Sequence, residues 1–257
     1  DFQVFGVAIP ENLRSLDRAV NERSVGPFTR RSHTTFIELT RGHYGAAMAL
    51  FVVRVWLPDR PGALGAVASR IGAVRADVVG IDILERGGGR AVDELTIDLD
   101  DARHVDLLIQ EIAQVDGVDV EHVRPARSAY SDRAVESLEL SARIVDSSSV
   151  QEALDVLVLG VRDLFDSDWA AVIDPAEGRT VAVAGGAEMP SAEWLAAFVI
   201  GTGHGEGAYA AVDELARTTL PRQAAELVVS RQHLPLRDAE RRIMSTLANM
   251  ADRHAER

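Results

Sequence analysis

Two periodicities of apolar and polar residues alternate along residues 49–124. Runs rich in β-branched and aromatic residues predict strands, and apolar residues three and four apart predict amphipathic helices. The expected elements are a strand at 49–57, a helix at 62–74, strands at 78–85 and 91–99, a helix at 100–115 and a strand within 116–125. The apolar face expected for the helix at 62–74 consists of Leu64, Val67, Ala68, Ile71 and Val74.

The order of these elements predicts how the segment packs. It is βαββαβ, the order of the ferredoxin-like fold, in which both helices cover one face of a four-stranded antiparallel sheet. The glycines at 87–89 predict a hairpin turn, because glycine adopts positive φ without strain. Alternate apolar residues define one face of each hairpin strand: Val79, Ile81 and Ile83, then Leu95, Ile97 and Leu99. The sheet face without helices needs a partner or a polar cover.

A second group of elements follows residues 125–134, which have the composition of a linker. The pattern predicts helices within 135–166, two strands within 169–185, a helix at 191–201, a strand at 224–232 and a final helix within 236–257. Ser149 is expected to cap the second helix, with Glu152 completing a capping box. The final helix is expected to pack through Ile243, Leu247, Met250 and His254. Residues 201–223 are glycine-rich and resist assignment.

Residues 1–47 differ from the rest of the chain. Their acidic and basic residues nearly balance, whereas the whole chain carries a net charge of −13. Met48 stands directly before the first predicted strand. We therefore interpret residues 1–47 as an N-terminal extension that is poorly ordered or not native, followed by a domain at 48–124.

Composition excludes several classes of function. The net charge of −13 and the absence of a basic block argue against nucleic acid as the main partner. The 257 residues include no cysteine, which excludes disulfides and thiolate chemistry and fits a cytoplasmic location. The sequence also contains no lysine, which removes Schiff-base chemistry. No apolar run approaches the ~18 residues of a membrane helix, so no membrane partner is expected.

The stretch LPDRPGAL at 57–64, between a strand and a helix of the βαββαβ segment, resembles an ACT domain over residues 49–124. ACT domains are small regulatory modules that usually bind amino acids. Pro61 suits a helix start and Gly62 permits a close backbone approach. The free N–H groups of a helix start favour a carboxylate.

The resemblance also implies site residues, because family ligands lie where this loop meets the second strand of a partner subunit. The corresponding positions are Asp59, Arg60, Gly62, Ala63 and Leu64, with Asp77 and Val78 at the start of the second strand. Many ligand-binding members have Asn where this chain has Asp59 and Asp77. Two carboxylates can receive an amino group but repel a carboxylate. A strand-to-helix turn that binds no ligand is the alternative interpretation.

Residues 135–257 resemble a GAF domain through an entry helix and hairpin at 149–178 and the strand and closing helix at 225–255. The step PLRDAERRI at 235–243 matches the family's entry into that helix. GAF domains bind cyclic nucleotides, tetrapyrroles, haem or small metabolites, or only dimerise. The middle of this segment is short and lacks the cysteine and lysine of the ligand-binding types, so the resemblance implies a degenerate module used for dimerisation.

Other candidate chemistry has simpler interpretations. Residues 201–207, GTGHGEG, lack the Gly-Lys-Ser/Thr ending of a phosphate loop and are expected to be a loop. His204 and Glu206 lack a second histidine at metal-ligand spacing. Asp98, Asp100 and Asp101 precede a helix, so Asp100 or Asp101 is expected to cap it. No catalytic motif is present, and no cofactor, metal or enzymatic activity is expected.

The sequence therefore predicts an α+β protein: a ferredoxin-like ACT domain joined to an α/β GAF-like domain at 135–257. The expected function is regulatory. An amino acid or related metabolite would bind at an ACT dimer interface, and the GAF-like domain would transmit the change. The alternative is a ligand-free scaffold that dimerises or docks onto a partner enzyme.

Overall fold

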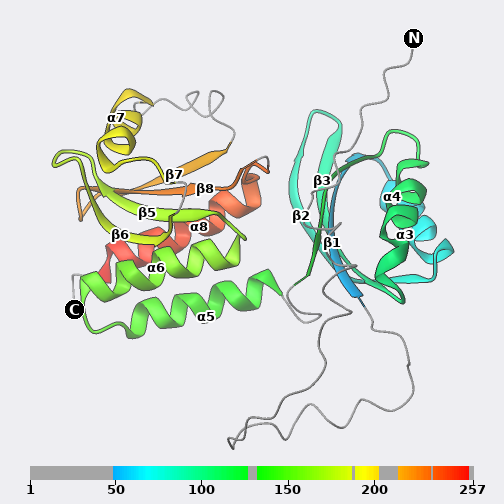
Figure 1. Cartoon of the computed structure of the whole chain (residues 1–257), viewed down its shortest axis with the longest axis horizontal. Coiled ribbons are helices and arrows are strands. Elements are labelled where there is room, and N and C mark those ends of the chain that lie inside the picture. The colour runs from blue at the N-terminus through cyan, green and yellow to red at the C-terminus, as the bar shows by residue number, and fades with distance from the viewer. Residues whose placement is uncertain (1–48, 127–131, 187–188, 203–213, 233, 255–257) are drawn as a thin grey trace, which may run out of the picture. The chain divides into compact units, whose positions relative to one another are not determined.

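The structure, a computed structural model, describes residues 49–126, 132–186, 189–202, 214–232 and 234–254 (Figure 1). It forms two compact units, the first built mainly from residues 49–126 and the second mainly from residues 132–254. The predictions for residues 1–47, for Met48 and for most of the GTGHGEG stretch lie outside the described residues.

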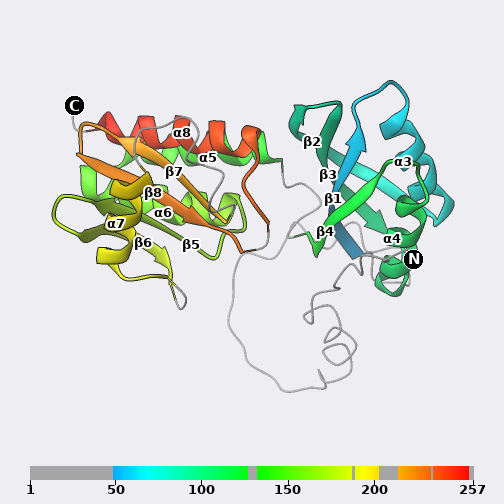
Figure 2. The same ribbon diagram turned by 90° about the horizontal axis from the view of Figure 1, so that it is seen from above.

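The first unit is a four-stranded antiparallel sheet covered by helices on one face, as Figures 1 and 2 show. Its elements are β1 (Ala49–Pro58), α3 (Ala63–Ala73), β2 (Ala76–Gly87), β3 (Arg90–Leu99), the 3₁₀ turn η2 (Ala102–His104), α4 (Val105–Ala113) and β4 (Asp119–Pro125). The strand order is β2-β3-β1-β4, and β1 is antiparallel to both β3 and β4. The predicted βαββαβ order and ferredoxin-like arrangement are confirmed.

The hairpin between β2 and β3 turns at Gly88 and Gly89, whose φ values are 59° and 78°. Two successive positive φ values make the turn type that matches the twist of a two-stranded ribbon, which explains the glycines there. β1 lies beside β3 with Pro58 opposite Arg90 and Val55 opposite Asp93. Residues Leu95, Ile97 and Leu99 of β3 all lie in the core, as predicted.

The predicted apolar face of α3 holds except at one residue. Val67 and Ile71 are buried and Leu64 and Val74 pack against the core, as predicted, whereas Ala68 is exposed and Ala63 is buried. The predicted stripe on β2 exists but is not covered: Val79, Ile81 and Ile83 are 44%, 49% and 47% exposed. These residues alternate with Val78, which packs against the core of the first unit, and with the buried Leu84, so the three exposed side chains share one side of β2.

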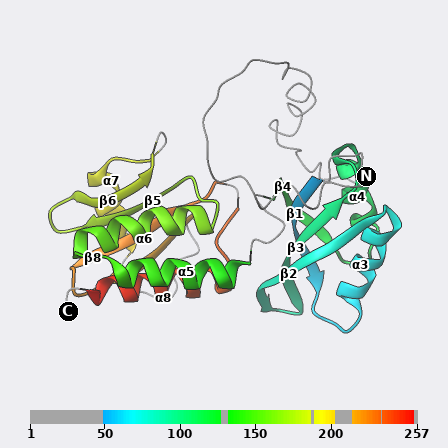
Figure 3. The ribbon, with the colours of Figure 1, turned by 90° about the horizontal axis from the view of Figure 1, so that it is seen from below.

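The second unit is also a four-stranded antiparallel sheet, with strand order β6-β5-β8-β7. Its elements are α5 (Arg133–Asp146), α6 (Val150–Leu164), β5 (Trp169–Asp174), β6 (Arg179–Gly185), α7 (Ala192–Thr202), β7 (Leu215–Leu220), β8 (Ala225–Ser230) and α8 (Asp238–Asp252). Figures 1 and 3 show α5, α6 and α8 on one face of this sheet and α7 on the other. Each face has its own apolar cluster, because successive residues of β5 alternate between them.

The predicted N-cap of α6 is present, and its capping box differs from the prediction by one residue. Ser149 caps α6 by accepting a hydrogen bond from the Glu152 N–H. The Glu152 carboxylate returns to the N–H of Ser148 instead of Ser149, so the predicted capping box is displaced by one residue. In α8 the buried apolar side chains are Met244, Leu247, Ala248 and Ala251. Of the predicted stripe, Leu247 is buried, Ile243 and Met250 pack partly buried against the same core, and His254 is half-buried. The stripe thus forms one edge of the buried face of α8, which also packs with β7, a strand that sequence periodicity did not predict.

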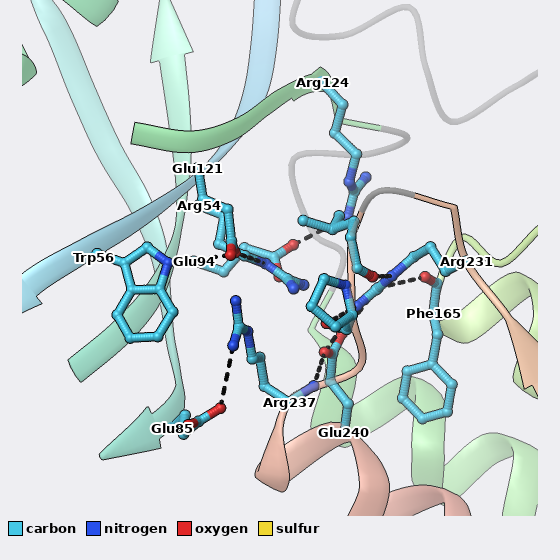
Figure 4. A network of polar contacts seen from close by, with 12 residues as sticks. Arg54, Trp56, Glu85, Glu94, Glu121, Arg124, Phe165, Arg231, Arg237 and Glu240 are labelled. Carbon is cyan, nitrogen blue, oxygen red and sulfur yellow. Dashed lines mark hydrogen bonds and ion pairs between the residues drawn. The ribbon is translucent and has the colours of Figure 1, made fainter. Parts of the chain in front are cut away.

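Each unit contains a buried ion pair, and Figure 4 shows both. In the first unit, Arg54 Nη2 donates to Glu94 Oε2 over 2.9 Å and Arg124 donates to the other carboxylate oxygen over 3.1 Å. In the second unit, Arg231 donates to both oxygens of Glu240, over 3.0 and 2.9 Å. The bidentate geometry of the Arg231–Glu240 pair makes it strong and directional, whereas in the first unit two arginines share the Glu94 carboxylate.

Candidate ligand site at the strand–helix junction

The junction between β1 and α3 is a short loop that folds back on itself. The Arg60 N–H donates to the carbonyl of Pro58 over 2.8 Å, and the Ala63 N–H donates to the carbonyl of Arg60 over 3.3 Å. The Asp59 N–H donates to the carbonyl of Gly89 over 2.9 Å, which ties the loop to the β2–β3 turn. The loop is therefore held by the backbone and leaves its side chains free to face outward.

Gly62 is the last residue before α3, and its φ of 88° explains why glycine is needed there. A Cβ at Gly62 or at Gly65 would meet no atom within 4 Å, so the space in front of the helix start is open. Gly62 supplies no capping side chain, and the first turn of α3 contains no acidic residue. Among the residues that the structure describes, no side chain caps this helix start, and its N-terminal partial charge suits an approaching carboxylate.

The predicted site residues of the junction differ in accessibility. Asp59 and Arg60 are exposed, and the Arg60 guanidinium lies 4.0 Å from the Asp116 carboxylate. Leu64 is half-buried, whereas Ala63 is buried in the core of the first unit. The Ala63 methyl group thus packs inside the domain, and only its backbone belongs to the open helix start.

Asp77 and Val78 lie far from the junction within one copy of the chain. β1 and β2 both run antiparallel to β3, so their first residues share one end of the sheet. The junction follows the last residue of β1, at the other end. A ten-residue strand spans about 30 Å, so one chain does not bring Asp77 and Asp59 together.

Asp93 is a functional candidate that sequence reasoning missed. It lies on the core-facing side of β3, between Ala91 and Leu95, and is only 3% exposed. Its Oδ1 accepts no hydrogen bond from any residue that the structure describes. Burial raises the pKa of the Asp93 carboxyl, the nearby Arg86 lowers it and Asp59 raises it further. The available sequence signal was an acidic residue at a position where the alternating pattern calls for an apolar one.

The acidic residues near the end of β3 have a structural role. Asp101 Oδ1 accepts a hydrogen bond of 2.9 Å from the Arg103 N–H and caps η2, which confirms the predicted cap. Hydrogen bonds from the Arg103 side chain and backbone lower the pKa of Asp101 to about 2. Burial and the charges of Asp100 and Asp77 raise the pKa of Asp98.

The described residues contain neither a metal-binding cluster nor a helix suited to a bilayer. No group of three or more His, Cys, Asp and Glu side chains among them is arranged to hold a metal ion. None of the helices within the described ranges is both long enough and apolar enough to cross a bilayer.

Comparison with known proteins identifies the first unit. Residues 51–117 match the family model of the ACT domain. The ACT domain from GTP pyrophosphokinase of Chlorobium tepidum is 18% identical, with 31% of this chain and 99% of that chain covered and a TM-score of 0.26. An unknown protein from Galdieria sulphuraria is 16% identical, with 37% and 64% covered and a TM-score of 0.28. No curated protein matches the sequence. The family match, on a βαββαβ unit with its open strand–helix junction, identifies residues 51–117 as an ACT domain.

Proposed function

We propose that the protein is a cytoplasmic regulatory sensor that binds an amino acid or a related small metabolite through its ACT domain. The observation that carries this proposal is the open, uncapped start of α3 at Gly62 within a segment that matches the ACT family. ACT domains are regulatory modules, so a ligand there would change the protein's assembly, not undergo a reaction. The proposal includes no enzymatic activity and no cofactor.

The ligand's carboxylate is proposed to meet the backbone N–H groups of the first turn of α3, near Leu64 and Gly65. This position combines unpaired backbone donors with the positive end of the helix dipole. Arg60 adds a positive side chain, and Asp59 adds an acceptor for the ligand's ammonium group. Gly62 is required for the loop conformation that exposes these groups.

The remaining proposed site residues, Asp77 and Val78, would come from a second copy of the chain. The roughly 30 Å that separates the ends of the sheet prevents them from serving the junction of their own copy. The exposed stripe of Val79, Ile81 and Ile83 supports such a pairing, because it continues β2 directly from Asp77 and Val78. Three large apolar side chains at alternate positions, all exposed on one side of a strand, are typical of a surface that a partner covers.

The second unit is proposed to be a degenerate GAF-like domain that dimerises and transmits the signal. Its sheet has helices on both faces, and its C-terminal helix α8 begins at the sequence step that resembles the GAF family. The same exposed stripe also favours a second candidate function, a scaffold that dimerises or docks without any small ligand. The two functions differ in whether any small molecule stabilises the protein.

Thermal unfolding of the full chain against each of the twenty amino acids at millimolar concentration tests the proposal. A ligand at 100 times its dissociation constant stabilises by about 2.7 kcal/mol, which moves the midpoint by several degrees. Gly65→Glu places a carboxylate in the proposed anion site, and since an acid is favourable in a first helical turn, the variant should fold. It should lose the ligand-dependent rise.

Ala68→Glu is the matched control, because it adds the same charge at an exposed position further along α3. It should keep the rise. If no amino acid shifts the midpoint of the unaltered chain, the sensor function is wrong. If Gly65→Glu responds as the unaltered chain does, the ligand binds elsewhere.

A further inference from the structure

We propose that helix α5 pairs with α5 of a second copy of the chain, in parallel and in register, through an apolar row on its outer side. The inference rests on the dimerising role proposed for the second unit. It adds which surface of that unit pairs and in which direction the two helices run.

The first observation is that α5 has two apolar sides. Its inner side buries Leu140 and Ile144, and the helix packs against α6 and α8 (Figures 1 and 3). A second row of apolar residues follows the opposite side of the helix: Val135, Leu138, Ala142 and Val145. Leu138 is 70% exposed, the largest exposed fraction among the large apolar side chains of the described ranges, and Val135 is 49% exposed. An exposed apolar row of this kind marks a surface that another molecule covers.

The second observation is the spacing within this outer row. Its members are separated by three, four and three residues, which is the spacing of the contact positions in a coiled coil. Such a row is covered best by another helix with the same spacing, because the side chains of each helix then fill the gaps of the other. A second copy of α5 carries that spacing, and the small Ala142 lets two helices approach closely there.

The charges beside the row determine the direction of the pair. One flank carries Asp132, Glu139 and Asp146, seven residues apart, whereas the other flank carries the uncharged Ala134 and Ser141. In a parallel pair each flank faces the opposite flank of the other helix, so the acidic residues face uncharged ones. In an antiparallel pair the two acidic flanks face each other and repel. The charge pattern therefore favours the parallel pair.

The size of the row determines how it relates to the β2 stripe. A stable interface takes about 20–30 residues from each partner, more than one face of α5 provides. The α5 pair is therefore one part of the dimer interface, and the contact proposed for β2 is the other. In a parallel pair the two α5 helices start side by side, and only residues 126–132 separate each start from β4 of the same copy. The pair would thus hold two ACT domains close together and favour their contact, and removal of either contact should dissociate the dimer.

Single-cysteine variants of the full chain test the pairing, because the 257 residues include no cysteine. In a parallel pair in register, residue 138 of one copy faces residue 138 of the other, within the reach of a disulfide. We expect mild oxidation to convert most of the Leu138→Cys variant into a covalent dimer on a non-reducing gel. Arg143→Cys is the matched control, since that residue is also exposed on α5 but lies outside the row. It should remain a single chain.

Two outcomes of the cross-linking overturn the inference. The first is that Leu138→Cys forms no more covalent dimer than Arg143→Cys. The second is that Leu138→Cys cross-links only when mixed with Ala142→Cys, because an antiparallel pair places residue 138 of one copy beside residue 142 of the other.

Light scattering on Leu138→Glu provides an independent measurement. We expect the mass to fall from two copies to one, with unchanged circular dichroism because the replaced side chain is exposed. A variant that stays dimeric contradicts the inference.

The amino-acid melting series separates this inference from the sensor function. If Leu138→Cys cross-links and no amino acid raises the melting midpoint, the pairing stands and the sensor function is wrong. If an amino acid raises the midpoint and Leu138→Cys does not cross-link, the sensor function stands and the pairing is wrong.

Discussion

The Asp59 N–H and the Gly89 carbonyl are joined by a 2.9 Å hydrogen bond, although thirty residues separate them in the sequence. This bond connects the loop before α3 to the turn between β2 and β3. Both segments depend on glycine in the left-handed region, Gly62 at 88° and Gly89 at 78°. The candidate site is therefore positioned by backbone geometry, and side-chain changes there can alter binding without moving the loop.

Gly62→Ala should destabilise the protein because it forces a side chain into the left-handed region. We expect the free energy of unfolding in urea to fall by about 1–2 kcal/mol. Gly65→Ala is the control: that residue lies inside α3 with open space around it, so alanine should stabilise by about 0.5–1 kcal/mol. Equal effects of the two substitutions would contradict the assigned backbone conformation.

Ile81→Glu should dissociate the proposed dimer by placing a charge in the middle of the β2 stripe. We expect light scattering to report a dimer for the unaltered chain and a monomer for the variant, with unchanged far-ultraviolet circular dichroism. Val183→Glu tests another exposed apolar residue, on β6 of the second unit. Dissociation by Val183→Glu alone would place the contact on the second unit instead of the ACT domain.

Glu240→Gln should be strongly destabilising, because it leaves the buried Arg231 guanidinium without its carboxylate partner. Arg231 also donates to the carbonyls of Phe165, Leu234 and Pro235, so its place is fixed by several segments. Breaking a buried pair on one side typically costs about 3–5 kcal/mol. Glu139→Gln, an exposed change on α5, should stay within about 0.5 kcal/mol in the same denaturant titration.

The pKa of Asp98 should lie above the ordinary value of 3.8, and the pKa of Asp101 should lie below it. Hydrogen bonds from Arg103 lower the pKa of Asp101 to about 2, and burial raises the pKa of Asp98. The stability that Asp101 contributes is thus complete above pH 3.8 and declines as the pH falls towards 2. The contribution of Asp98 has the opposite sign and is lost as the pH rises through its folded-state pKa.

Carboxyl resonances followed by nuclear magnetic resonance measure both titrations in one experiment. Arg103→Ala should return the pKa of Asp101 towards 3.8 and leave the pKa of Asp98 unchanged. A shared midpoint for the two groups in the unaltered protein would show that the hydrogen bonds from Arg103 are not formed in solution.

The first unit was predictable in its elements because local rules dominate there. Alternating apolar residues, the triple glycine and the proline-glycine helix start each act over a few residues. Sequence periodicity did not predict β7, whose neighbours β8 and α8 come from later in the chain. The full width of the buried face of α8 depends on that long-range packing, so the sequence predicted Ile243 and Leu247 but not their buried neighbour Met244.

The candidate site was predictable only in part. The junction at Asp59–Gly62 is a local feature and lies where the sequence placed it. The distance between Asp77 and the junction depends on how the strands run relative to one another in the sheet. The apolar pattern of each separate strand carries no information on that arrangement. Asp93 went unnoticed because one acidic residue among the inward-facing apolar positions of β3 leaves the period-two pattern of the strand intact, although its burial is unfavourable.

The placement of Asp77 and the junction at opposite ends of one sheet has a consequence for dose response. In a twofold-symmetric pair, each copy would lend its β2 start to the other's helix start, so two equivalent composite sites would form together. The apparent affinity for the ligand would then rise with protein concentration, and dilution of the protein alone would weaken ligand binding. Such a sensor reports the product of two abundances, its own and that of its ligand.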